Sequence, residues 1–189
     1  MEILDTALPD VKLIRLDVFS DERGGFTETY DSKKFEKLGI RATFFQDSWS
    51  LSKSVGTVRG FHFQNPPHAQ SKLVRVIRGR ILDVVVDIRR GSPTFGAHVA
   101  VELSSERPLS LFVPIGFAHG FCTLEDGTEV TYKMSDHFVP ELYRGIFWAD
   151  PRLGVAWPVS PEAALLSAKD RQHPLLADIE TPFEFTTSC

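Results

Sequence analysis

The sequence predicts an all-β protein, a sandwich or barrel with a few short helices. Short runs of β-branched and aromatic residues recur along the chain, separated by Gly, Pro and Asp at intervals of about 8 to 12 residues. A length of 189 residues with 42% hydrophobic residues suits one domain with a substantial core. We therefore expect a single domain over 1–189, whose last part, from about 158 to 189, is an arm packed on the β-domain.

The N-terminal part alternates in the manner of two strands joined by a turn. Residues 10–19 are predicted as the first strand, 21–25 as a glycine-containing turn and 26–30 as the returning strand. Asp31 is a typical N-cap residue, which predicts a short helix over 32–38.

The middle of the chain carries most of the predicted strands. Gly79 and Arg80 stand between two apolar runs, which predicts a tight hairpin at this point. Residues 161–166 have helical propensity, so the C-terminal arm is expected to contain a helical piece. The predicted strands cover 44–50, 57–64, 72–79, 81–89, 97–103, 109–113, 118–124, 128–133 and 144–148.

Composition argues against several classes of partner. The net charge is −4 and there is no basic block, so nucleic acid is not expected as a partner. The two cysteines, Cys122 and Cys189, give no disulfide framework, which is typical of a protein in the cytoplasm. The N-terminus does not read as a secretory signal, and no apolar run approaches the roughly 20 residues needed to cross a bilayer, so no membrane association is expected.

The stretch around His62 is the first that points to chemistry. Alternation along a strand would place His62 on the face opposite Arg59, Phe61 and Phe63, and Lys72 opens the next predicted strand. A lone histidine in a strand is most simply a hydrogen-bonded core residue. A histidine with cations nearby in an apolar strand pair instead indicates a pocket, because unpaired polar groups are costly in a core.

A second stretch, Pro114-x-Gly116-x-x-His119, resembles the second motif of cupin barrels. Metal-binding cupins carry two histidines and a glutamate in their first motif, whereas the matching place here holds His62 followed by Phe63 and Gln64. Since a metal ion needs three or four donors, His62 and His119 alone make a weak site, and no metal is expected.

Ten motifs, taken in order, resemble those of dTDP-4-dehydrorhamnose 3,5-epimerases over about residues 5 to 180. The resemblance implies a cupin-like jelly roll without metal or cofactor. It also implies a homodimer that exchanges its N-terminal strands, about residues 10–30. The motifs lie at 21–24, 45–47, 58–64, 72–75, 83–89, 92–96, 114–121, 132–133, 150–151 and 167–170.

The implied reaction converts dTDP-4-dehydro-6-deoxy-D-glucose to dTDP-4-dehydro-L-rhamnose. The C4 ketone acidifies the protons on C3 and C5, and inversion needs a base on one face of the sugar and an acid on the other. The resemblance implies that His62 is the base and Tyr132 the proton donor. Asp170 would hold the far nitrogen of the imidazole, and Lys72 would stabilise the enolate. Read alone, Tyr132 would be a packed ring, and Asp170 part of a solvated ion pair.

The resemblance also implies a set of substrate-binding residues. Arg23 and Arg59 suit the pyrophosphate, Phe26 would border the nucleotide, and Phe138 would stack on thymine. The other implied contacts come from Glu28, Gln46, Asp47, Ser48, Lys72, His119, Tyr143 and Lys169.

Three residues depart from the family pattern, namely Ser48, Trp49 and Tyr143. They leave open an epimerase that inverts only C3 or only C5 of a related dTDP-4-keto-deoxysugar. A metal-dependent cupin oxygenase and a non-catalytic module that binds a nucleotide sugar also remain as competing hypotheses.

Overall fold

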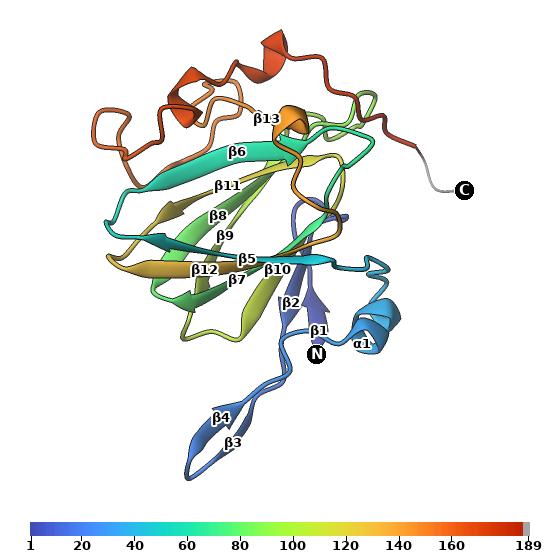
Figure 1. Cartoon of the computed structure of the whole chain (residues 1–189), viewed down its shortest axis with the longest axis vertical. Helices are drawn as coiled ribbons and strands as arrows, with labels where there is room; N and C mark the ends of the chain where they lie inside the picture. Colours follow the sequence, from blue (N-terminus) through green and yellow to red (C-terminus); the bar gives the residue numbers. More distant parts are fainter. Residues whose placement is uncertain (187–189) are drawn as a thin grey trace.

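The computed structural model describes residues 1–186, which fold as two antiparallel sheets packed face to face (Figure 1). This confirms the predicted all-β class with a few short helices. In spatial order, the six-stranded sheet contains β1 (Glu2–Leu4), β2 (Lys12–Arg15), β10 (Leu109–Val113), β7 (Lys72–Arg78), β12 (Thr128–Met134) and β5 (Gln46–Ser52). The five-stranded sheet contains β13 (Tyr143–Gly145), β6 (Val58–Gln64), β11 (Phe117–Thr123), β8 (Arg80–Asp87) and β9 (His98–Ser104).

The helices are short and peripheral. Helix α1 (Ser32–Lys37) begins as predicted, because the Asp31 side chain accepts a hydrogen bond from the backbone N–H of Lys34. Phe35 of this helix is buried against the outer face of the six-stranded sheet. Within residues 1–186 no helix has the length and apolar character that crossing a bilayer requires. The remaining helices are single 3₁₀ turns at Pro140–Leu142, Asp170–Gln172 and Leu176–Asp178.

The main core lies between the sheets, and β8 shows how the sequence builds it. Ile81 and Val85 point into this core, whereas Val84 and Val86 point the other way. Both faces of the strand are buried, which explains its near-continuous apolar run.

The outer face of the five-stranded sheet is covered by the C-terminal part of the chain. Phe61 and Phe63 pack there against Leu153, Leu176 and Phe183, in agreement with the alternation predicted for the two rings. The predicted helical piece at 161–166 is wrong. Leu165 instead pairs with the start of β6, donating its backbone N–H to the Gly56 carbonyl and accepting from Val58, so its backbone bonds join distant segments and do not form a helix.

Three other strand predictions needed correction. The predicted strand at 10–19 is divided into β2 and β3 (Phe19–Asp21), and its partner β4 (Gly24–Phe26) ends well before residue 30. Strand β1 was not expected. Gly79 does not make a hairpin, because β7 and β8 belong to different sheets, so the chain crosses from one layer of the sandwich to the other at that residue.

Cys122 is free and buried beneath the C-terminal segment, beside Trp148 and Ala164. Burial raises the pKa of this thiol to about 11, so at neutral pH it remains an apolar, unreactive part of the core. Cys189, the other cysteine of the sequence, lies outside the described residues.

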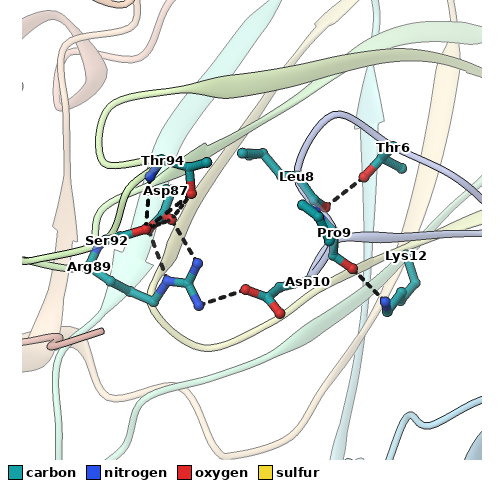
Figure 2. Close-up of polar contacts among 9 residues, drawn as sticks. All are labelled: Thr6, Leu8, Pro9, Asp10, Lys12, Asp87, Arg89, Ser92 and Thr94. Atoms are coloured by element: carbon teal, nitrogen blue, oxygen red, sulfur yellow. Dashed lines mark hydrogen bonds and ion pairs between the residues drawn. The ribbon is translucent and has the colours of Figure 1, made fainter. Parts of the chain in front are cut away.

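Arg89 forms two ion pairs at the end of β8, a buried one with Asp87 and one with Asp10 of the N-terminal loop (Figure 2). The fully buried carboxylate of Asp87 accepts from Arg89 at 2.7 Å and from the hydroxyls of Ser92 and Thr94, each at 2.7 Å. Arg89 also donates to Asp10 at 2.8 Å. Burial raises the pKa of Asp87, but these hydrogen bonds lower it by more. The net pKa therefore lies below its usual value, and the carboxyl stays ionised to a lower pH than an exposed aspartate would.

Replacing Asp87 with asparagine is expected to destabilise the fold by about 3 kcal/mol, because Arg89 then loses a buried counter-charge. Since the folded-state pKa lies below the unfolded one, the stabilisation is complete above the ordinary pKa of 3.8 and is lost as the pH falls through the folded-state pKa. Urea unfolding of Asp87→Asn, beside the exposed control Glu184→Gln, measures the difference. Equal losses of stability in the two variants would contradict the assignment.

Candidate active site

A cavity of about 490 Å³ opens between the two sheets, within the range of about 300 to 1000 Å³ that is usual for small-molecule sites. All four residues predicted to be catalytic line it, although they lie far apart in the sequence. Besides Lys72, which was predicted in both roles, seven of the predicted substrate-binding residues line it as well. These two groups are His62, Tyr132, Asp170 and Lys72, and then Gln46, Ser48, Arg59, His119, Phe138, Tyr143 and Lys169.

His62 on β6 is paired with Asp170 of the C-terminal segment. Its Nε2 atom lies 2.5 Å from Oδ1 of the carboxylate, and the two side chains are 18% and 6% exposed. Burial lowers the pKa of His62 to about 4, although Asp170 opposes this shift. Burial raises the pKa of Asp170, but the neighbouring imidazoles of His173 and His62 lower it by more, so the carboxylate is ionised at neutral pH. The imidazole is therefore neutral and oriented by an anion.

Tyr132 reaches the same cavity from the other sheet. It lies on β12, and its hydroxyl is 3.1 Å from the hydroxyl of Ser50 on the neighbouring strand β5. Burial raises the pKa of this phenol well above its ordinary value of 10, so the proton stays on oxygen at neutral pH. A neutral base and a protonated acid thus face one cavity from opposite layers of the sandwich.

Two further polar groups complete the floor of the cavity. The ammonium group of Lys72 donates to the His62 carbonyl at 3.3 Å, and burial lowers the pKa of Lys72 to about 8. His119 is buried and pairs with both carboxylate oxygens of Asp83, at 2.9 and 3.0 Å. A lysine ammonium group and a second imidazole are therefore present in one site.

The position of Arg59 corrects the prediction from strand alternation. Arg59 lines the cavity together with His62 instead of pointing to the opposite face. Between the register pairs His62–His119 and Arg59–Phe121, β6 advances three residues while β11 advances two. The extra residue resets the alternation at a bulge. Gly60 permits it, because a Cβ there would lie 2.6 Å from the Gly120 Cα.

The remaining lining residues suit a ligand with an aromatic and an anionic part. Phe138 and Tyr143 meet edge to face with ring centroids 5.3 Å apart, and the Lys169 ammonium lies 4.5 Å from the centroid of the Tyr143 ring. Gln46 accepts a hydrogen bond from the backbone of Phe138 and so fixes this ring over the cavity. Trp49 is also at the edge of the cavity, but its indole donates to Glu129.

Four predicted substrate-binding residues are not brought to this cavity. Asp47 points away from it and pairs with Lys133 at 2.9 Å. Arg23, Phe26 and Glu28 lie on or just after the β3–β4 hairpin, which projects from the body of the molecule (Figure 1). The side chain of Arg23 is 85% exposed.

Several functional candidates were missed from the sequence. Asp83 could have been noticed, because a carboxylate within an apolar strand demands a partner. Ser50 lies on the same face of its strand as Gln46 and Ser48, and this alternation could also have identified it as a residue of the site. His173 follows Asp170 by three residues and lies beside it, and this spacing could have pointed to it. Donor atoms of His62, Asp170 and His173 all lie within 4.8 Å of one another, a spacing that could hold a metal ion.

The sandwich brings a histidine paired with a carboxylate, a phenol and a lysine to one cavity, an arrangement that could perform acid–base chemistry on a small polar ligand. The family described as dTDP-4-dehydrorhamnose 3,5-epimerase matches residues 5–178, and the chain belongs to this family. A 3,5-epimerase of Salmonella typhimurium is 48% identical over 179 residues, which cover 93% of this chain and 96% of that protein. A Neisseria gonorrhoeae relative, also 48% identical over 90% of this chain, is longer, and the chain spans 51% of it.

Solved structures agree with the fold. A Legionella pneumophila 3,5-epimerase in complex with dTDP-4-keto-L-rhamnose superposes with a TM-score of 0.90 at 42% identity, covering 95% of this chain and 94% of that chain. A 3'-monoepimerase from Streptomyces bikiniensis in complex with dTDP-quinovose gives a TM-score of 0.84 at 32% identity, covering 94% and 88% of the two chains. These similarities support the cupin-like jelly roll that the sequence predicted.

Proposed function

We propose that the protein epimerises dTDP-4-dehydro-6-deoxy-D-glucose at C3 and C5, giving dTDP-4-dehydro-L-rhamnose. The observation that carries this proposal is the placement of His62 and Tyr132, which reach one cavity from different sheets. A sugar ring between them would meet a base on one face and an acid on the other, as inversion of a carbon next to a ketone requires. An enzyme of nucleotide-sugar synthesis would act in the cytoplasm.

The hydrogen bond to Asp170 decides which atom of His62 is the base. Neutral imidazole carries one proton, and Nε2 needs it to donate to the ionised carboxylate. Nδ1 is then left with a free lone pair, which can remove the proton from C3 or C5. The imidazolium that forms is stabilised by Asp170, in the manner of a catalytic triad.

The enolate and the diphosphate both need positive charge. Lys72, which is buried beside His62, would stabilise the negative oxygen that develops at C4. Arg59 and Lys169 would bind the diphosphate, and Phe138 would stack on the thymine ring. Arg59 is held ready for this role by bonds to the Ser52 hydroxyl and the Leu51 carbonyl, each at 3.1 Å.

Turnover in deuterated water tests the proposed reaction. Incubation with dTDP-4-dehydro-6-deoxy-D-glucose should place deuterium at both C3 and C5, because each proton is removed and replaced from solvent. Label at one carbon would indicate a mono-epimerase, the activity suggested by the Streptomyces structure and by the departures at Ser48 and Tyr143. Label at neither carbon would contradict the proposal, and dependence of any turnover on iron or zinc would indicate a cupin oxygenase instead.

The pKa values of the site predict a wide pH range for activity. The base His62, with its pKa at about 4, stays neutral until the pH falls to that value, so kcat/KM should decline below about pH 4 and not near 6.5. Lys72, with its pKa at about 8, loses its charge as the pH rises, so kcat/KM should decline above about pH 8. A pH–rate profile in which kcat/KM already declines near pH 6.5 would contradict the lowered pKa that burial gives His62.

We propose that a second copy of the chain completes the site. Phe19 and Phe26 on the β3–β4 hairpin are 62% and 65% exposed, although each is a large apolar side chain. Exchange of this hairpin within a homodimer would cover both rings and bring Arg23 and Glu28 to the partner's cavity. The family resemblance implies such an exchange.

Mixing two impaired variants tests this shared site. Arg23→Ala should lower kcat/KM about 10- to 100-fold through the lost phosphate contact, and His62→Ala should remove the base. After unfolding and refolding together at equal amounts, about half the dimers are mixed and half the sites in each are intact, so activity should return to about one quarter of the parent's. Activity no greater than that of the two variants measured separately would contradict a site shared between subunits.

A further inference from the structure

His173 lies directly behind the pair formed by His62 and Asp170. Its Nε2 atom is 3.5 Å from Oδ1 of Asp170, the same oxygen that lies 2.5 Å from Nε2 of His62. The side chains of His173 and Asp170 are only 9% and 6% exposed. The carboxylate is therefore flanked by two imidazoles, one in the cavity and one behind it.

The surrounding backbone is shaped to hold the second imidazole. A Cβ at Gly145 would lie 2.4 Å from Nε2 of His173, so the ring lies against β13 only because residue 145 has no side chain. Gly145 is also the register partner of His62. On the other side, the Phe147 N–H donates to the Pro174 carbonyl at 2.7 Å and fixes the chain that follows His173.

The geometry around Nε2 indicates what this ring does. This buried nitrogen has no hydrogen-bond partner within residues 1–186, and Asp170 Oδ1 lies at the limit of bonding distance. A buried N–H left unpaired is costly, and a carboxylate oxygen has two lone pairs, so it can accept from both imidazoles. A small approach of the His173 ring would satisfy the nitrogen and hold the carboxylate from behind.

We propose that His173 is a positioning residue that holds the Asp170 carboxylate in line with the His62 base. The inference rests on the proposed epimerase function, in which Asp170 fixes the orientation of His62. His173 does not line the substrate cavity but an adjoining cavity of about 430 Å³. It therefore acts through Asp170 and not through the substrate.

The same three residues could instead hold a divalent cation, since their donor atoms lie within 4.8 Å of one another. The charges nearby oppose this. The Lys72 ammonium lies against the His62 carbonyl, and Lys169 directly precedes Asp170. We therefore favour the positioning role and make a bound metal one outcome of the test.

Two substitutions separate positioning from packing. His173→Leu keeps apolar volume but removes the N–H, whereas His173→Gln can place an amide N–H near the position of Nε2. His173→Leu should lower kcat about 10- to 100-fold and leave KM within about twofold. His173→Gln should retain kcat within about threefold of the parent. Equal losses in both variants, or a loss confined to KM, would overturn the proposal.

A second measurement does not depend on turnover. In the ligand-free protein, the proton between His62 and Asp170 should give a downfield NMR signal, which should shift or broaden in His173→Leu and be restored in His173→Gln. An unchanged signal in His173→Leu would overturn the positioning role even if the parent proved not to be an epimerase. Treatment of the parent with EDTA should not change kcat, and a loss of activity that Zn²⁺ restores would assign the three residues to a metal.

Discussion

His62→Asn should lose both product formation and the exchange of sugar protons with solvent. The asparagine side chain can still accept and donate hydrogen bonds, but it cannot take a proton near neutral pH, so the first step of each epimerisation fails. General-base catalysis contributes about 10²- to 10⁴-fold, and we expect kcat to fall by about 10³-fold or more. Turnover in deuterated water, followed by NMR, measures both effects at once.

His68→Asn is the matched control for this variant. His68 is half-exposed, pairs with Asp136 at 3.2 Å and does not line the cavity. Its replacement should leave kcat within about twofold of the parent, since surface pairs contribute little. If His62→Asn retained proton exchange at the rate of the parent, another group would have to be the base, and the assignment would fail.

Tyr132→Phe should separate proton removal from inversion. The phenylalanine ring keeps the packing against His119 and Phe121, but the proton donor on the second face is lost. His62 can still remove a proton and return one to the same face, so deuterium should enter the substrate while product forms about 10²- to 10³-fold more slowly. NMR of the recovered sugar distinguishes labelled substrate from product.

The control here is Tyr30→Phe, because Tyr30 packs against Phe35 and Phe44 away from the cavity. It should leave both labelling and product formation unchanged. Equal loss of labelling and of product in Tyr132→Phe would show that the phenol is needed before the first proton leaves, which contradicts a role as acid on the opposite face.

Much of the fold could be predicted because its signals are local. Asp31 capped the helix that it was expected to cap, and the alternation of Phe61 and Phe63 correctly placed both rings on the face opposite His62. The layer crossing at Gly79 could not be predicted in this way, since one residue between two strands looks the same whether they pair or separate. The helical propensity of 161–166 was likewise overridden by pairing with distant backbone.

The candidate site likewise contains residues that could be predicted from the sequence and residues that could not. Residue types chosen for their chemistry, such as His62 and Lys72, do meet in the cavity. Arg59 could not be placed from the sequence, because its direction depends on a bulge that only the register between β6 and β11 reveals. Asp83 matters through its contact with His119 on a neighbouring strand, which no spacing along the chain indicates, whereas His173 follows its partner Asp170 by only three residues.

A crystal structure of the protein with its dTDP-linked 4-keto sugar would test most directly whether base and acid act from opposite faces. We expect the sugar ring between Nδ1 of His62 and the hydroxyl of Tyr132, with C3 or C5 about 3 to 4 Å from each. A sugar bound so that both side chains meet the same face, or that only one of them touches it, would contradict the proposed mechanism.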